Sequence, residues 1–180
     1  FNYSDQATIQ RVLIHPTQPN ILLASVAAVA SAARGIWRST DDGATWTNVY
    51  GGAKYDMEFN PANPNMVYAS AYGYLLRSTN AGATWSNMTS TVFPTVGQTS
   101  SKISVTPGNP NVVYVQWVNN LGNVLGMYKS FDTGLTWSAQ NTYSFSTQGV
   151  YDWAMAVSPI DSNKLIYGGQ FMYRSNNAGV

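Results

Sequence analysis

Asp41 and Asp132 are the first candidates for chemistry, because each lies in a phrase with fixed residue types and spacing. The phrase occurs three times, as STDDGATW, STNAGATW and SFDTGLTW, and it begins again near the end of the sequence as SNNAGV. A carboxylate among hydroxyl side chains can act as a general acid or base, or it can accept hydrogen bonds from its own turn. Asn80 stands at the aspartate position of the second phrase, and an amide can close a turn but cannot replace a general acid. The pattern therefore favours the structural role.

Each remaining position of the phrase also has a local structural task. Gly43 can adopt a positive φ, and Trp46 supplies a large apolar ring to pack between sheets. The sequence predicts the same tasks in every copy. The residues assigned to this structural turn are Ser39, Asp41, Gly43, Trp46, Ser78, Asn80, Gly82, Trp85, Ser130, Asp132, Gly134 and Trp137.

The acidic residues outside these turns offer weaker catalytic candidates. Asp5, Asp56, Glu58 and Asp152 are free for chemistry in this interpretation, and Asp56 and Asp152 are the weak catalytic candidates. Both of these follow a tyrosine, which favours a repeated capping role instead. Glu58 stands between two apolar residues, so an internal salt bridge is an equal alternative to catalysis.

The sequence predicts no metal site and no cofactor. His15 is the single histidine, and Asn60, Thr106 and Ser158 occupy the corresponding position elsewhere, so it is interpreted as a loop substitution. No spacing typical of metal ligands occurs, and cysteine is absent. Asp161 occupies a turn position.

A second repeated phrase alternates with the first and shows where the strands lie. A proline is followed four residues later by an asparagine, and apolar residues stand four and two positions before the proline. This period of two predicts a strand that enters a tight turn. A second strand follows the asparagine, and a third ends in Arg or Lys before the serine. The predicted units span 11–56, 57–102, 103–154 and a truncated 155–180, as parts of one domain.

The composition fits this interpretation and excludes some partners. Charged residues make up 9% of the sequence and the formal net charge is +1, so no nucleic-acid footprint is present. Arg38, Arg77, Lys129 and Arg174 occupy one repeat position, the end of the third strand. No apolar run is long enough to span a membrane.

Units of four short antiparallel strands predict an all-β fold, a β-propeller with about four blades in this chain, which we expect to be part of a larger propeller. The phrase SxDxGxTW resembles the Asp-box of bacterial sialidases, xyloglucan-cleaving hydrolases and sortilin-type receptors. With the PxNPNxVYA phrase, the chain is most similar to the sortilin-type and xyloglucanase-type arrays. The stretch QGVYDWAMAVSPIDSNKLIYGG further resembles secreted Asp-box proteins of Bacteroidetes-type bacteria.

The loops that do not repeat are the predicted binding surface. One sheet edge carries only the repeated turns, while the loops at the other edge vary in length, and variable loops on a rigid scaffold commonly bind ligands. Trp117 and Trp153 have an equal alternative, packing between sheets. The binding candidates are Tyr55, Asp56, Trp117, Asn119, Asn120, Tyr151, Asp152 and Trp153.

Two classes of function remain. The first is a secreted or cell-surface propeller that binds a protein or glycan without catalysis, with further blades or domains of the same chain as neighbours. The second is a glycoside hydrolase of the xyloglucanase type, which needs two carboxylates about 5 to 10 Å apart. The sequence favours binding, because no carboxylate pair stands in a motif of the hydrolases. It also predicts that the 180 residues alone aggregate or stay partly unfolded.

Overall fold

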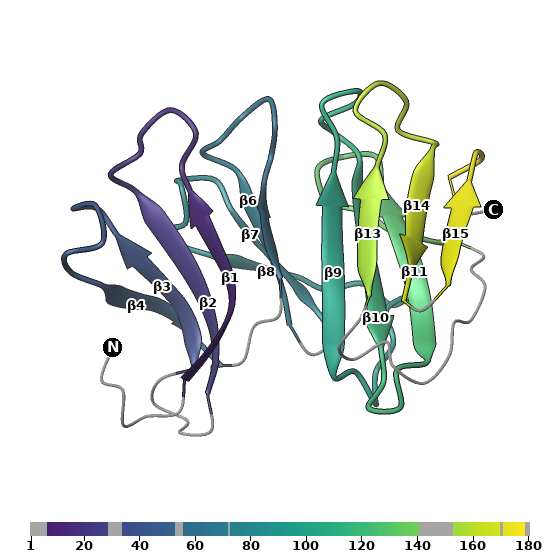
Figure 1. Cartoon of the computed structure of the whole chain (residues 1–180), viewed down its shortest axis with the longest axis horizontal. Coiled ribbons are helices and arrows are strands. Elements are labelled where there is room, and N and C mark those ends of the chain that lie inside the picture. The colour runs from purple at the N-terminus through teal and green to yellow at the C-terminus, as the bar shows by residue number, and fades with distance from the viewer. Residues whose placement is uncertain are drawn as a thin grey trace. The chain divides into compact units, whose positions relative to one another are not determined.

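The computed structural model describes residues 7–28, 34–52, 56–71, 73–140, 153–169 and 171–178. These residues form strands, turns and loops, and no helix occurs among them. The chain divides into two compact units, Phe1–Ala71 with Leu75–Asn87, and Tyr72–Tyr74 with Met88–Val180. Each unit holds two antiparallel sheets (Figure 1).

The first unit contains the first and second sheets, in which consecutive strands are neighbours. This order results from short turns between strands, because antiparallel strands need only a tight connection. The first sheet consists of β1 (Ala7–Ile14), β2 (Leu22–Ala28), β3 (Gly35–Ser39) and β4 (Thr47–Gly51). The second sheet consists of β5 (Met57–Phe59), β6 (Val67–Ser70), β7 (Leu75–Ser78) and β8 (Ser86–Met88).

The second unit contains the third and fourth sheets, again in sequence order. The third sheet consists of β9 (Ser100–Val105), β10 (Val113–Val118), β11 (Val124–Ser130) and β12 (Ser138–Gln140). The fourth sheet has three strands, β13 (Ala154–Val157), β14 (Leu165–Gly168) and β15 (Met172–Ser175). The predicted all-β architecture and the four-strand repeat are confirmed.

The turn between the first two strands of each sheet is built alike, although its key residue changes. Asn60 Oδ1 accepts hydrogen bonds from the backbone N–H groups of Ala62 and Asn63, both at 3.0 Å. His15 Nδ1 accepts the equivalent bond from Gln18 N at 3.1 Å. His15 thus accepts hydrogen bonds within this turn, a role compatible with the loop substitution inferred from the sequence. Burial together with the nearby Arg38 lowers its pKa and favours the neutral, accepting form. We call the segments from the proline to the asparagine of each sheet the Pro/Asn turns. They span residues 16–20, 61–65, 107–111 and 159–163.

The core of the second unit lies between its two sheets. Tyr114, Val118 and Met127 of the third sheet pack with Leu165 and Tyr167 of the fourth. All five side chains are almost fully buried. The hydroxyl of Tyr114 also donates to the Ser162 carbonyl at 2.8 Å, so the apolar core ends in a polar contact between the two sheets.

Candidate functional site

The Asp41 carboxylate is occupied by its own turn. Its Oδ1 accepts hydrogen bonds from Ser39 Oγ at 2.7 Å and from Thr45 N at 2.9 Å, and its Oδ2 accepts from Thr45 Oγ1 at 2.6 Å. The Thr45 hydroxyl and N–H, together with Ser39, lower the pKa of Asp41 to about 2. A group held ionised in this way is a poor general acid near neutral pH.

Gly43 has the positive φ that the sequence predicted, and the half-buried Trp46 closes the turn with a hydrogen bond. Gly43 has a φ of +88°, and its N–H donates to Ser39 Oγ at 2.9 Å. The indole of Trp46 donates to the Gly43 carbonyl at 3.0 Å. We call this arrangement the Ser-to-Trp turn.

The second Ser-to-Trp turn has the same geometry with an amide in place of the carboxylate. Asn80 Oδ1 accepts from Ser78 Oγ and from Thr84 N, both at 2.9 Å. Asn80 Nδ2 donates to Thr84 Oγ1 at 2.8 Å, so the bond to the threonine hydroxyl reverses its direction. A hydroxyl both donates and accepts, and it can therefore serve either an aspartate or an asparagine.

The third Ser-to-Trp turn repeats the first. Asp132 Oδ1 accepts from the N–H groups of Leu135 and Thr136 at 3.0 and 2.8 Å, and Oδ2 accepts from Thr136 Oγ1 at 2.6 Å. Burial alone would raise the pKa of Asp132, but the hydrogen bonds from Thr136 and Ser130 outweigh it and hold the pKa below its ordinary value.

In each sheet, one residue that the sequence did not single out joins the Ser-to-Trp turn to the Pro/Asn turn. The residue after Asp or Asn in each Ser-to-Trp turn has a left-handed backbone, although it is not glycine. Its N–H donates to the carbonyl of the asparagine in the Pro/Asn turn of the same sheet, at 2.7 to 3.2 Å. This bond explains why the two phrases alternate strictly along the sequence. The four residues are Asp42, Ala81, Thr133 and Ala178.

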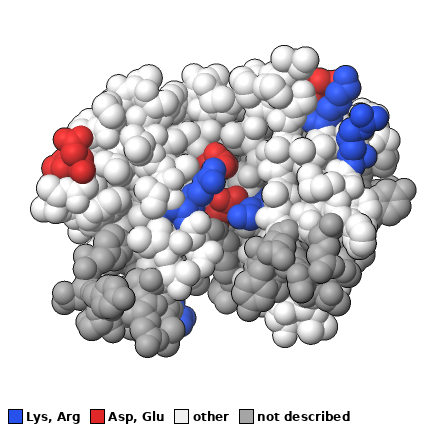
Figure 2. Space-filling model, in the orientation of Figure 1, with Lys and Arg blue, Asp and Glu red and all other residues white. Residues whose placement is uncertain are grey.

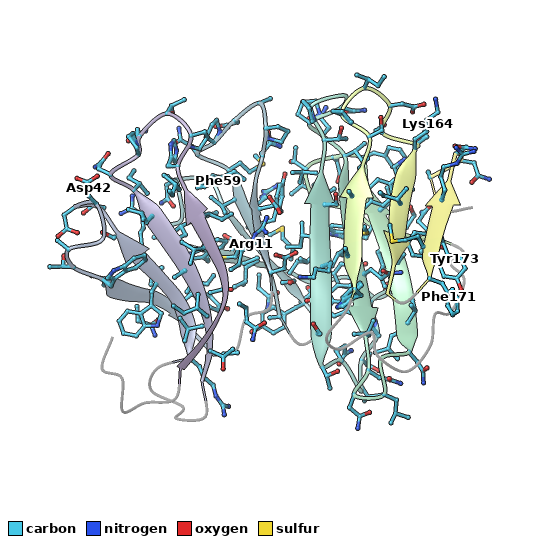
Figure 3. All side chains as sticks on the ribbon, in the orientation of Figure 1. Arg11, Asp42, Phe59, Lys164, Phe171 and Tyr173 are labelled. Carbon is cyan, nitrogen blue, oxygen red and sulfur yellow. The ribbon has the colours of Figure 1, made fainter. Side chains whose placement is uncertain are left out.

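Two other carboxylates of the first unit, those of Asp56 and Glu58, are engaged with Arg11. The Arg11 guanidinium contacts Glu58 Oε1, and its Nε lies 3.6 Å from Asp56 Oδ1 and donates to the Met57 carbonyl at 3.3 Å. Asp56 Oδ1 also accepts from Met57 N at 3.0 Å. Figure 3 labels Arg11, and Figure 2 shows basic and acidic atoms side by side near the centre of this view. The expectation that Asp56 and Glu58 are free for chemistry is therefore wrong, and the salt bridge expected as an alternative for Glu58 is present.

The β10–β11 hairpin is the best described part of the variable edge. Asn119 Oδ1 accepts from the N–H groups of Leu121 and Asn123 at 2.9 and 3.0 Å, and this fixes the turn. Asn120 is exposed, and Leu121 has 60% of its surface exposed at the tip. Asn119 thus positions the hairpin backbone, and its neighbours face solvent.

Trp117 is fully buried in an aromatic cluster. This agrees with the alternative in which Trp117 packs in the protein interior and does not bind a ligand. Its ring centroid lies 4.8 Å from that of Phe93 and 5.5 Å from that of Tyr128. Phe93 also lies 5.3 Å from Trp137, the last residue of the third Ser-to-Trp turn. Phe93 belongs to the long segment between β8 and β9, and the repeat pattern carried no signal for it.

Of the other binding candidates, one lies in the core and three lie outside the residues that the structure describes. Trp153 is 6% exposed and belongs to the core between the third and fourth sheets. Tyr55, Tyr151 and Asp152 lie outside the described residues, as does Asp5. The longest described stretches of the variable edge are therefore the β10–β11 hairpin and the segment before β9.

Two further features are absent from the described ranges, a metal-binding cluster and a membrane-spanning helix. No group of three or more His, Cys, Asp and Glu side chains that could hold a metal ion occurs there. Within the same ranges, no helix is long and apolar enough to cross a membrane.

Comparisons with known proteins agree on the fold. No protein-family model matches the chain, and no curated protein matches it significantly. An ancestral GH74 enzyme is similar in structure, with a TM-score of 0.74 and 18% identity over 97% of this chain and 23% of that one. The GH74 enzyme of Niastella koreensis has a TM-score of 0.64 and 20% identity over 94% of this chain and 28% of that one.

A third similar structure is YCF48 bound to D1 peptide. Its TM-score is 0.52, with 16% identity over 94% of this chain and 54% of that one. The chain thus spans about a quarter of the length of the two GH74 enzymes and about half that of YCF48. At these identities the likeness shows the fold alone, and the chain has the β-propeller fold, built from four-stranded antiparallel blades.

Proposed function

We propose that this chain is part of a secreted or cell-surface propeller of the Asp-box kind that binds a protein or glycan ligand without catalysis. The binding surface is the edge that carries the β10–β11 hairpin. One observation carries the proposal: Asp41, Asp132, Asp56 and Glu58 are all held by structural bonds, while Leu121 is presented to solvent on a fixed turn.

The alternative, a glycoside hydrolase of the xyloglucanase type, needs a carboxylic acid and a second carboxylate across a sugar-binding cleft. Asp56 and Glu58 share Arg11, which favours the charged form of both and opposes proton donation by either. Two of the similar structures are GH74 enzymes, so this alternative is included in the test.

Binding is tested with the whole chain against an array of plant and bacterial polysaccharides and a peptide library. Leu121→Asp places a charge at the exposed tip and should weaken binding at least tenfold. Ile160→Asp is the matched control, because Ile160 is 87% exposed at a Pro/Asn turn, on the repeated edge. Equal binding by wild type and Leu121→Asp would contradict the proposed surface.

The same polysaccharides separate binding from hydrolysis. We expect no release of reducing ends by the wild-type chain. Release that is abolished by Asp56→Asn and retained by Leu121→Asp would establish the hydrolase and overturn the proposal.

A further inference from the structure

A basic residue at the end of the third strand contacts the following sheet in both units. In the first unit, Arg38 Nε of the first sheet donates to the Ala81 carbonyl of the second sheet at 2.9 Å. In the second unit, Lys129 Nζ of the third sheet donates to Asn163 Oδ1 of the fourth at 2.9 Å. Arg38 and Lys129 occupy the same repeat position, so the surroundings of the two cations can be compared directly.

The Lys129 cation is enclosed by protein. Its Nζ lies 4.4 Å from the ring centroid of Phe131 and 5.1 Å from that of Tyr114. Lys129 is only 1% exposed. Cation–π contacts with two rings and the bond to Asn163 therefore satisfy this ammonium group within the protein.

The Arg38 cation has a different neighbour and borders a pocket. Thr40 occupies the position of Phe131 in the first sheet, and the shorter side chain leaves space beside the guanidinium. A pocket of about 230 Å³ lies there, between the β3–β4 hairpin of the first sheet and the Ser-to-Trp turn of the second. Its lining consists of Arg38, Thr40, Thr45, Thr47, Val49 and Ala83.

The pocket contains hydrogen-bond donors that no described residue uses. Arg38 donates to Ala81 through Nε, and its remaining N–H groups make no hydrogen bond with a described residue. The hydroxyls of Thr40 and Thr47 likewise make no hydrogen bond within the described ranges. The Thr45 hydroxyl donates to Asp41 Oδ2, so it can only accept from a ligand.

The charge of the pocket favours an anion. Arg38 is half-buried and forms no ion pair with a described carboxylate. A guanidinium group binds planar oxyanions through parallel N–H donors. Asp41 and Asp42, the latter labelled in Figure 3, belong to the same turn, but neither lines the pocket. Their negative charge should keep the affinity for an anion low.

We propose that this pocket binds a small oxyanion, a carboxylate or a sulfate group, with Arg38, Thr40 and Thr47 as donors. The volume is below the roughly 300 to 1,000 Å³ of pockets for drug-sized ligands, which suits a small group. The site belongs to the first unit and does not depend on the binding surface proposed for the β10–β11 hairpin of the second.

NMR titration of the whole chain with sodium sulfate and with sodium acetate tests the proposal. Sodium chloride keeps the ionic strength constant in both titrations. The amide resonances of Thr40 and Thr47 should shift and reach saturation with at least one of the two anions, and the tighter one identifies the preferred group. Shifts that grow without saturation for both anions would overturn the proposal.

The comparison with the third sheet supplies the sharpest variant. Thr40→Phe copies the Phe131 position, should fill the pocket and should weaken anion binding at least tenfold. Thr79→Phe is the matched control, because Thr79 occupies the equivalent position of the second sheet and does not line this pocket. It should bind the anion as the wild type does.

A second variant tests the cation itself. Arg38→Gln removes the positive charge and should also weaken binding at least tenfold, and circular dichroism checks that each variant is folded. Thr40→Phe keeps Arg38 and its bond to Ala81, so it separates loss of the ligand site from loss of the contact between the sheets. Anion binding that persists in both Thr40→Phe and Arg38→Gln would overturn the proposal.

Discussion

The first and second Ser-to-Trp turns have the same hydrogen-bonded shape with different chemistry at the central residue. Asp41 Oδ2 accepts a hydrogen bond from the Thr45 hydroxyl at 2.6 Å, whereas Asn80 Nδ2 donates a hydrogen bond to Thr84 Oγ1 at 2.8 Å. The bonds from the serine and from the backbone N–H of the threonine are otherwise retained. The turn therefore needs an acceptor oxygen at this position and does not need a charge.

The two turns differ in the atoms that surround their glycines. Alanine substitution of these glycines gives the largest expected change in the free energy of unfolding. Gly43 and Gly82 have φ values of +88° and +77°, so alanine is strained at either position. A Cβ on Gly82 would also lie 2.5 Å from Cδ2 of Leu23, which is fully buried, whereas a Cβ on Gly43 would be 3.8 Å from the nearest atom, on Trp46.

Gly82→Ala should therefore cost about 2 to 4 kcal/mol, the sum of strain and overpacking, and Gly43→Ala only about 1 kcal/mol. Urea unfolding of the whole chain measures both values. Equal losses would show that Leu23 moves away from the added methyl group without cost.

The central carboxylate gives a smaller effect. Asp132→Ala removes the acceptor for the N–H groups of Leu135 and Thr136 and should cost about 1 kcal/mol, because water can replace part of the lost bonding at this exposed turn. Asp132→Asn keeps the acceptor Oδ1 and should cost only about 0.3 kcal/mol. Asn80→Asp in the second turn should cost equally little.

Thermal unfolding of the three variants provides the measurement. If the alanine and asparagine variants lost the same stability, charge would matter more than the acceptor oxygen. The structural interpretation of the Ser-to-Trp turn would then fail.

The fold could be predicted from the repeated residues. Most contacts of the candidate site involve residues outside the repeat and could not be predicted. The aspartate, glycine and tryptophan of each turn act locally, within eight residues, so their roles could be inferred from spacing alone. The left-handed backbone at Asp42 depends on a bond to Asn20 in another turn, and no glycine marked the position. The ion pairs of Arg11 join strands far apart in sequence, and single-sequence patterns do not reveal such pairings.

The aromatic candidates show the same limit. The sequence placed Trp117 in a variable loop, whereas it lies in β10, and the sequence could not show that Phe93, from an unpatterned segment, packs against it. Packing from a distant segment therefore decided between the binding and packing interpretations of Trp117.

The smallest expected effect is an acid titration confined to the first of the two turns. The pKa of Asp41 falls from an ordinary value of 3.8 to about 2 in the folded chain. A depressed pKa stabilises the fold above the unfolded value, so this contribution is complete above pH 4 and is lost as the pH falls toward 2. Asn80 has no proton to gain in this range. The amide resonance of Thr45 should therefore shift with a midpoint near pH 2, while that of Thr84 stays constant, and Asp41→Asn should remove the Thr45 titration. A Thr45 midpoint near pH 4 would mean that the turn does not favour the carboxylate form of Asp41. The two turns would then share their geometry, but the hydrogen bonds to Asp41 would not be strong enough to lower its pKa.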